Sequence, residues 1–268
     1  MTIFHISSVR KPLVAALLGA ALASTALASD ELVTDRPDVS ESSEVVGKGR
    51  TQIETSFVSQ RDDADGTRIR LRNTPTLLRI GIAERFELRI ETDGYSSLRA
   101  DGAFPVHASG MADTALGIKW HMQDADDDDF VPSVAWLLHA DFATGAKAFQ
   151  GQGVRPSLRM VAEWELPQGW SVGAMPGVFN DKSEAGERYS AGLLALVLGK
   201  EFSSQWRGFV EVSADQLAAA RFGGNVTSWD AGVAYQVNKD VQLDFSISRG
   251  ISKSAVDSSV GVGLSVRY

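Results

Sequence analysis

The chain has 268 residues, of which 44% are hydrophobic and 22% are charged, and it contains no cysteine. These fractions exclude a disordered or collagen-like chain. The absence of cysteine excludes disulfide bonds, thiolate metal sites, a cysteine nucleophile and a lipidated N-terminal cysteine. The net charge of −8 argues against a nucleic-acid partner, because such a partner is bound largely by neutralisation of its phosphates.

The first 28 residues have the pattern of a secretory signal peptide. Arg10 and Lys11 give a positively charged start, Leu13–Leu22 is a short apolar run, and Ala26–Ala28 fits small-x-small cleavage. The apolar run is well short of the roughly 20 residues that span a membrane as a helix, which favours cleavage over an N-terminal anchor. We predict a signal peptide at 1–28, an N-terminal periplasmic or lumenal segment at 29–49 and one domain at 50–268.

The remaining sequence alternates between apolar and polar residues, which is the pattern of strands with two different faces. In Phe86–Glu91, phenylalanine, leucine and isoleucine alternate with glutamate, arginine and glutamate. Val241–Ser248 and Val256–Tyr268 show the same period, and the longest apolar run, Leu193–Leu198, is too short for a membrane helix. About twelve such segments follow one another, at 50–60, 67–82, 85–95, 110–122, 131–143, 153–166, 170–180, 188–200, 206–215, 225–237, 241–250 and 256–268.

The second of these segments changes phase. The arginines of Arg68–Arg72 do not share the parity of Arg79, and Pro75 lies between them. Because proline cannot donate a hydrogen bond within a central strand, we expect a bulge there. The connectors alternate between short turns and longer loops, as in outer-membrane barrels, and Ser96–Ser109 is predicted to be one of the outer loops.

A soluble β-sandwich would also show alternation, but three features favour a membrane barrel. Twelve long strands leave little chain for Greek-key crossovers, the polar faces carry small residues and charges of both signs, and the tryptophans mostly lie near strand ends. The C-terminal Tyr268 is typical of chains that the outer-membrane assembly machinery receives. We therefore predict an all-β fold: a single antiparallel up-and-down transmembrane β-barrel of about 12 strands, in contact with outer-membrane lipid and reached through the periplasm.

Three strings resemble a known family. Thr34–Ser42, Gly81–Arg89 and Gly110–Trp120 are similar, in this order, to motifs of the outer-membrane transporters named for the MetA pathway of phenol degradation. The resemblance extends from about Thr34 to Tyr268, and it departs at Phe142–Gly145, where the family's usual proline before Thr-Gly is missing. This resemblance implies a barrel that serves as a channel for aromatic compounds or other small organic solutes.

If the apolar parity faces lipid, the other parity lines the pore. Charges on a pore wall can brace neighbouring strands through ion pairs or act as an electrostatic filter for solutes. For any single residue we favour bracing. For the arginines of the second and third strands, which face glutamates, we favour the filter, in which a transverse electric field acts on polar or carboxylated solutes. The pore-lining candidates are Arg68, Arg70, Arg72, Arg79, Glu87, Arg89, Glu91, Asp113, Lys119, His139, Asp141, Arg155, Arg159 and Glu163, and Glu165, Glu211 and Asp244 share their parity.

The acidic residues 30–48 precede the first strand and have two interpretations. They form either a solvated periplasmic tail or a plug in which Asp35, Arg36 and Asp38 enter the lumen and the acids pair with lumen arginines. Deletion of the segment distinguishes the two, because only a plug would change conductance.

No catalytic residue, metal site or cofactor is predicted. A lipid-modifying barrel would need a Ser-His pair at the lipid-facing surface, but His139 has the inward parity, His107 lies in an outer loop and His121 is beside a turn. The acidic run Asp126–Asp129 lacks the glycine and the final glutamate of an EF-hand loop. We predict passive uptake of small organic solutes, with phenols as examples, and a lipid-modifying or structural barrel with a closed lumen as alternatives.

Overall fold

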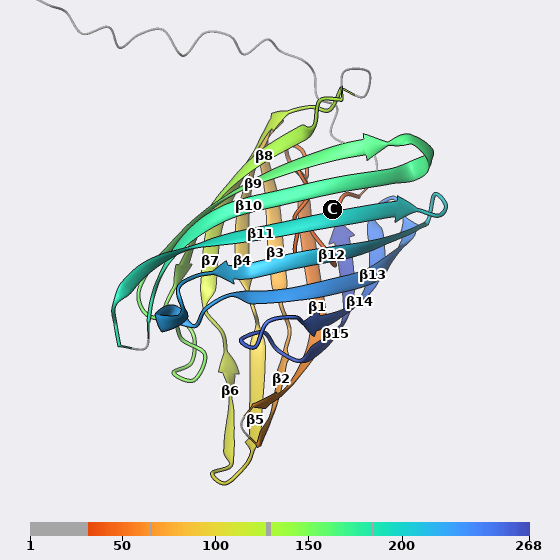
Figure 1. Cartoon of the computed structure of the whole chain (residues 1–268). Coiled ribbons are helices and arrows are strands. Elements are labelled where there is room, and N and C mark those ends of the chain that lie inside the picture. The colour runs from red at the N-terminus through yellow and green to blue at the C-terminus, as the bar shows by residue number, and fades with distance from the viewer. Residues whose placement is uncertain (1–31, 65, 127–129, 184) are drawn as a thin grey trace, which may run out of the picture.

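The computed structural model describes residues 32–268 except 65, 127–129 and 184, so the predicted signal peptide lies outside the described residues, as does most of the acidic run Asp126–Asp129. Nearly all of the described chain is β-structure (Figure 1). The strands are β1 (Thr51–Ala64), β2 (Thr67–Asn73), β3 (Thr76–Ala83), β4 (Phe86–Thr92), β5 (Tyr95–Asp101), β6 (Val106–Met111), β7 (Thr114–Gln123), β8 (Ser133–Phe142), β9 (Arg155–Leu166), β10 (Trp170–Lys182), β11 (Arg188–Glu201), β12 (Trp206–Leu217), β13 (Val226–Asn238), β14 (Val241–Gly250) and β15 (Ser258–Arg267).

The sheet closes on itself. β15 pairs with β1 in an antiparallel register from Gln52↔Arg267 to Arg61↔Ser258. The pairs β2 and β3, β4 and β5, and β6 and β7 are each two parts of one long strand, so the fifteen described segments form twelve barrel strands. The twelve-stranded antiparallel barrel predicted from the sequence is therefore confirmed. None of the described helical segments is long and apolar enough to cross a membrane.

The alternation of the sequence places apolar side chains outside and charged side chains inside. On β4, Phe86, Leu88 and Ile90 are about two-fifths exposed on the outer face, whereas Glu87 and Arg89 are buried inside the barrel. An interior with buried charges and a surface with exposed aliphatic side chains is the reverse of a soluble domain, and it matches a barrel surrounded by lipid.

Aromatic side chains mark the periplasmic rim of the barrel. Phe86 stacks on Trp120 with ring centroids 6.0 Å apart, and Trp206 packs against Tyr235 at 4.8 Å. These rings lie beside the short connectors, of which Pro167–Gly169 is a single 3-10 turn. Because aromatic rings favour the interface between hydrocarbon and water, their position locates one edge of the lipid-facing band.

A four-stranded sheet extends beyond the barrel, at the bottom of Figure 1. The far half of β1 pairs with β2, β2 with β5, and β5 with β6, and we call this sheet the extension. The prediction of an outer loop at Ser96–Ser109 is thus wrong, because most of this range is a hairpin with a short connector at 102–105. Its polar outward residues lie beyond the lipid-facing band, so they lack the apolar alternation that marks a membrane strand.

The predicted bulge at Pro75 is also wrong. β1 pairs with β2 and with β3 in one continuous register, shown by Val58↔Asn73 and Thr55↔Thr76. The extra residue lies instead on the next strand, at the junction between β4 and β5. There Gly94 has a φ of +67°, and a Cβ at this position would lie 2.1 Å from the carbonyl oxygen of Thr74. Only glycine fits this conformation and this close approach.

The continuous register determines where the arginines of β2 point. Arg79 on β3 is buried inside the barrel, and Arg68, Arg70 and Arg72 have the opposite parity on the same continuous strand. These three side chains therefore lie on the outward face of the extension rather than in the pore. This corrects their prediction as pore-lining residues, which depended on the bulge at Pro75 to reconcile the two phases.

Candidate functional site

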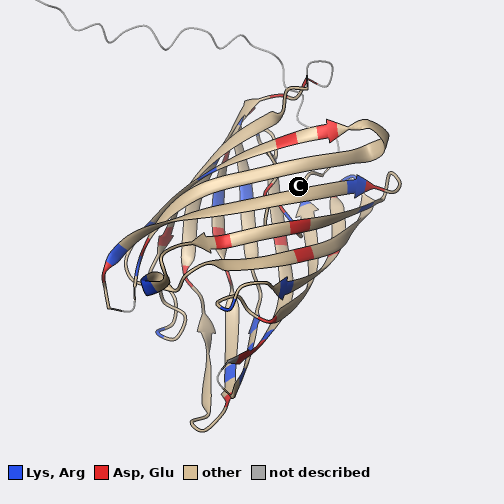
Figure 2. Cartoon of the chain, in the orientation of Figure 1, with Lys and Arg blue, Asp and Glu red and all other residues tan. Residues whose placement is uncertain are grey.

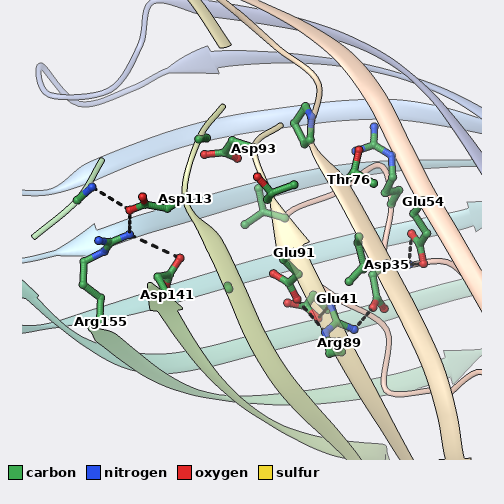
Figure 3. A pocket seen from close by; sticks show the side chains of 18 of the residues that line it. Asp35, Glu41, Glu54, Thr76, Arg89, Glu91, Asp93, Asp113, Asp141 and Arg155 are labelled. Carbon is green, nitrogen blue, oxygen red and sulfur yellow. Dashed lines mark hydrogen bonds and ion pairs between the residues drawn. The ribbon is translucent and has the colours of Figure 1, made fainter. Parts of the chain in front are cut away.

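The N-terminal segment, residues 32–50, lies within the barrel and returns to the side from which it enters. The backbone N–H of Leu32 donates to the carbonyl of Lys239 at 3.0 Å, beside a periplasmic turn. At the other end, the N–H of Gly49 donates to the carbonyl of Gly81 at 2.8 Å, next to the start of β1. Asp35 and Glu41 lie between these anchors and reach the charged wall of the lumen (Figure 3).

Asp35 is the centre of an ion cluster in the lumen. Its carboxylate lies 3.4 Å from Arg79, 2.6 Å from Arg89 and 2.8 Å from Lys119, which come from β3, β4 and β7. All four side chains are at least 98% buried. Charges removed from water in this way are stable only when they are paired and hydrogen-bonded, so the cluster fixes the segment against one wall.

Wall carboxylates complete the neutralisation of these cations. Glu87 lies 2.9 Å from the Nε atom of Arg79 and 2.9 Å from Arg89, and Glu54 lies 3.1 Å from Arg79. Acidic and basic groups thus alternate across β1, β3 and β4. Much of the predicted transverse field is therefore internally compensated while the segment is in place.

Further contacts hold the segment to the opposite wall. Glu41 accepts a hydrogen bond from Arg159 on β9 at 2.8 Å and also pairs with Arg89 at 2.8 Å. Glu211 on β12 accepts from the backbone N–H groups of Val39 and Ser40, both at 2.8 Å. The segment is therefore tied across the whole width of the lumen.

Two more acidic side chains of the wall bind this segment. Glu163 on β9 accepts from the backbone N–H of Ser43 at 2.6 Å. Asp244 on β14 accepts from Arg36 at 3.1 Å. These contacts are hydrogen bonds, which the same groups would exchange for hydrogen bonds to water if the segment left the lumen.

The segment separates two cavities, each of about 360 Å³. Asp35, Arg36 and Glu41 line the outer cavity, which opens toward the outer loops (Figure 3). Asp38 and Ser43 line the inner cavity, which reaches the periplasmic turns. Different residues of the same short segment therefore face the outer and the inner cavity.

The remaining predicted pore residues are divided among distinct places. Glu91, Asp113, Asp141 and Arg155 line the outer cavity, where Arg155 lies 2.8 Å from Asp113 and 3.9 Å from Asp141 (Figure 3). Sequence reasoning missed Glu54, although its position on the inward parity of the first strand was a usable signal. The predicted outer loop residue His107 lies on β6 of the extension.

His139 comes close to two carboxylates. Its Nε2 atom is 3.2 Å from Glu91, and Glu41, Glu91 and His139 present ligand-type atoms within 4.8 Å of one another. The ring lies across Gly117, where a Cβ would be 1.8 Å from it. Both carboxylates already pair with Arg89, and this guanidinium opposes a metal cation at the cluster.

Two aspartates outside the strands have lowered pKa values. Burial alone would raise the pKa of Asp113, but hydrogen bonds from the N–H groups of Gly151 and Gly145, together with Arg155, lower it below its ordinary value. A hydrogen bond from His121 is the main cause of the lowered pKa of Asp124 on the periplasmic side. Both carboxylates are therefore ionised anchors for loops.

A closed barrel with an apolar outer band and a charged lumen defines an outer-membrane β-barrel. The family model described as "Putative MetA-pathway of phenol degradation" matches residues 34–268, so the chain belongs to that family. This confirms the resemblance seen in the sequence motifs. A comparison with curated proteins gives no match.

Solved structures share the fold at low sequence identity. The COG4313 outer membrane channel from Pseudomonas putida F1 is 11% identical, with a TM-score of 0.62 over 87% of this chain and 99% of that one. The KdgM porin in complex with disordered oligogalacturonate is 10% identical, with a TM-score of 0.53 over 80% and 98% of the two chains. The NanC porin is 10% identical, with a TM-score of 0.51 over 81% and 98%. These relatives are described as channels and porins.

Proposed function

We propose that the protein is an outer-membrane channel for passive uptake of small organic solutes, and that the N-terminal segment is its gate. The observation that carries this proposal is the position of the segment between an outer and an inner cavity. The segment is held by polar contacts at both walls, and its displacement would join the two cavities. The membership of the family and the fold shared with channels support the same function.

The outer cavity favours an aromatic solute with a polar substituent. Pro75, Leu77 and Phe149 contribute apolar surface to it, and Arg89 and Arg155 contribute guanidinium groups. Its volume of about 360 Å³ is at the lower end of the range for small-molecule sites. A phenol or aromatic acid would place its ring on the apolar surface and its oxygen near a guanidinium. The family description points to the same class of solutes.

The proposal includes the partners expected of an outer-membrane barrel. Exposed aliphatic side chains such as Leu116 and Val262 would contact lipid. Tyr268 is 74% exposed at the end of the chain, where its carbonyl accepts from the N–H of Thr51 at 3.2 Å beside the closing seam. We assign this C-terminal aromatic residue to recognition by the assembly machinery.

Single-channel recording in a planar bilayer tests the gate. We expect small or infrequent current steps from the mature protein, and several-fold larger steps after deletion of residues 30–48. Addition of phenol or benzoate to the truncated channel should produce brief blocks if the solute binds in the joined cavity. Two silent proteins that are both shown to be folded would contradict the proposal and favour a closed structural or lipid-modifying barrel.

A further inference from the structure

The extension carries a row of basic side chains on its outward face. The strand registers place Arg61, Arg70, Arg99 and His107 opposite one another on β1, β2, β5 and β6. Neighbouring strands are about 4.8 Å apart, so the four groups lie within roughly 15 Å of one another. We call these four residues the basic row (the extension is at the bottom of Figure 2).

The basic row follows two other rows in a fixed order. Phe57, Tyr95 and Met111 are about half exposed on the same outward face, closer to the barrel. Two residues further along the three strands are serines, at 59, 97 and 109, with Arg72 of β2 in the same row, and two residues further again is the basic row. The outward surface thus changes from apolar to mixed hydroxyl and cationic, and then to the basic row, over roughly 13 Å along the strands.

This order is the one that a membrane interface imposes. Aromatic and apolar side chains end the lipid-facing band at the level where the hydrocarbon meets the headgroups. A basic side chain a few ångströms beyond that level is at the height of the lipid phosphates. The extension therefore holds its basic row against the headgroups of the outer leaflet, while its opposite face is turned toward the barrel axis.

Three of the four side chains of the basic row have no ion-pair partner among the described residues. Like charges directly opposite on neighbouring strands destabilise a sheet. Arg99 pairs with Asp101 at 2.9 Å, and Arg68, in the next row, pairs with Asp63 at 3.6 Å. Within the described part of the chain, Arg61, Arg70 and His107 have no ion-pair partner, and the buried Nε atom of Arg70 has no hydrogen-bond acceptor.

The surface over these residues is hollow. A cavity of about 330 Å³ is lined by Arg70, Arg72, Arg99 and His107, with the hydroxyl groups of Ser97 and Ser109 beside them. Guanidinium groups bind phosphate oxygens in pairs, and serine hydroxyl groups add further donors. We propose that this cavity binds the phosphorylated headgroup of an outer-leaflet lipid, which supplies the anion that the basic row lacks. The assignment is independent of whether the barrel conducts solutes.

Native mass spectrometry of the purified mature protein in detergent micelles tests the proposal, with lipid A as the probe. The test variant is the double substitution Arg70→Gln and Arg99→Gln. The matched control is Lys182→Gln with Arg188→Gln, which removes two positive charges from opposite positions at the outer ends of β10 and β11, on the far wall. Heat-modifiable migration on a gel establishes that each variant is a folded barrel.

We expect the wild type and the control to retain lipid A, and the test variant to bind it roughly 30-fold more weakly, which corresponds to about 1 kcal/mol for each arginine near an anionic surface. Dephosphorylated lipid A should bind to all three proteins as weakly as lipid A binds to the test variant. Equal retention by the test variant and the wild type would overturn the proposal. Displacement of lipid A by inorganic phosphate at equal concentration would overturn the assignment to a lipid and identify a soluble anion as the ligand.

Discussion

Lys119 donates hydrogen bonds to both carboxylate oxygens of Asp35, at 2.8 and 2.9 Å, in a part of the lumen from which solvent is excluded. One partner is on the wall and the other is on the N-terminal segment. The pair therefore joins the fold of the barrel to the position of the N-terminal segment, because loss of either charge leaves the other buried without compensation.

Asp35→Asn should release the segment. It removes the negative charge shared by Arg79, Arg89 and Lys119, and removal of one partner from a buried cluster costs about 3–5 kcal/mol. We expect the segment to become accessible to added protease while the barrel stays resistant. Asp63→Asn is the control, because Asp63 pairs with Arg68 only at the exposed surface of the extension. Equal protection of the segment in Asp35→Asn and the wild type would contradict the role of the cluster.

Glu211→Ala should lengthen the time that the channel stays open in a planar bilayer. The carboxylate accepts from the backbone N–H groups of Val39 and Ser40, and its loss removes these two contacts with β12 without changing the cluster at Asp35. We expect a several-fold longer open time, and partial recovery in Glu211→Gln, which retains an acceptor oxygen. Unchanged recordings for both variants would indicate that the gate moves without breaking this contact.

Deletion of residues 30–48 should shift the ion selectivity of the channel toward anions. The deleted stretch contains six acidic and two basic residues. Its removal takes Asp35 and Glu41 away from Arg79, Arg89, Lys119 and Arg159, so the lumen loses more negative than positive charge. The reversal potential in a salt gradient measures this selectivity. A deletion variant that also carries Arg79→Gln and Arg89→Gln should have a reversal potential shifted back toward cation selectivity, which would assign the effect to these two residues. An unchanged reversal potential in this variant would contradict the assignment.

Gly94→Ala should destabilise the junction between the barrel and the extension. A left-handed φ and a Cβ only 2.1 Å from the carbonyl oxygen of Thr74 predict a cost above about 2 kcal/mol. Gly66→Ala is the matched control, since Gly66 also has a positive φ, of +77°, but a Cβ there would meet nothing within 4 Å. Urea unfolding of the two variants in lipid vesicles measures the difference. Equal midpoints would show that the close approach to Thr74 is relieved at no cost.

Acid should release the outer loop that Asp113 holds. Because the pKa of Asp113 is lowered in the folded protein, its contribution to stability is present above the ordinary value of 3.8 and is lost as the pH falls through the folded pKa. We expect slow hydrogen exchange of the Gly145 and Gly151 amides at pH 7. In strong acid, after correction for the intrinsic exchange rate, these two amides should exchange faster. Asp113→Asn should show fast exchange already at pH 7, and a wild-type profile in that variant would contradict the assignment.

The barrel was predictable because the alternation within each strand depends only on that strand's own lipid-facing and lumen-facing sides. A strand between lipid and a polar lumen must alternate, so Phe86–Glu91 reveals its two faces without any knowledge of its neighbours. The extension was not predictable in the same way, because Tyr95–Asp101 has its polar face outward and its apolar face inward, and nothing in the segment shows that it has left the membrane. The differing parity of Arg68–Arg72 and Arg79 predicts a bulge at Pro75, but that strand keeps one register and the extra residue is on the next strand, beside Gly94.

The composition of the lumen was more predictable than its arrangement. The inward parity identified Arg79, Glu87, Arg89 and Lys119, and the structure brings all four together. Which acid they surround depends on how residues 32–50 fold inside the barrel. That path results from contacts between residues far apart in sequence, such as Val39 with Glu211, and no local pattern encodes them.

Both anchors of residues 32–50, at Leu32 and Gly49, are on the periplasmic side of the barrel, so the segment is a loop with its apex toward the outer cavity. A solute that arrives from outside meets only this apex and can push against it, whereas a solute or a force on the periplasmic side acts on the tethered ends. Solutes that move inward and solutes that move outward therefore act on different parts of the segment.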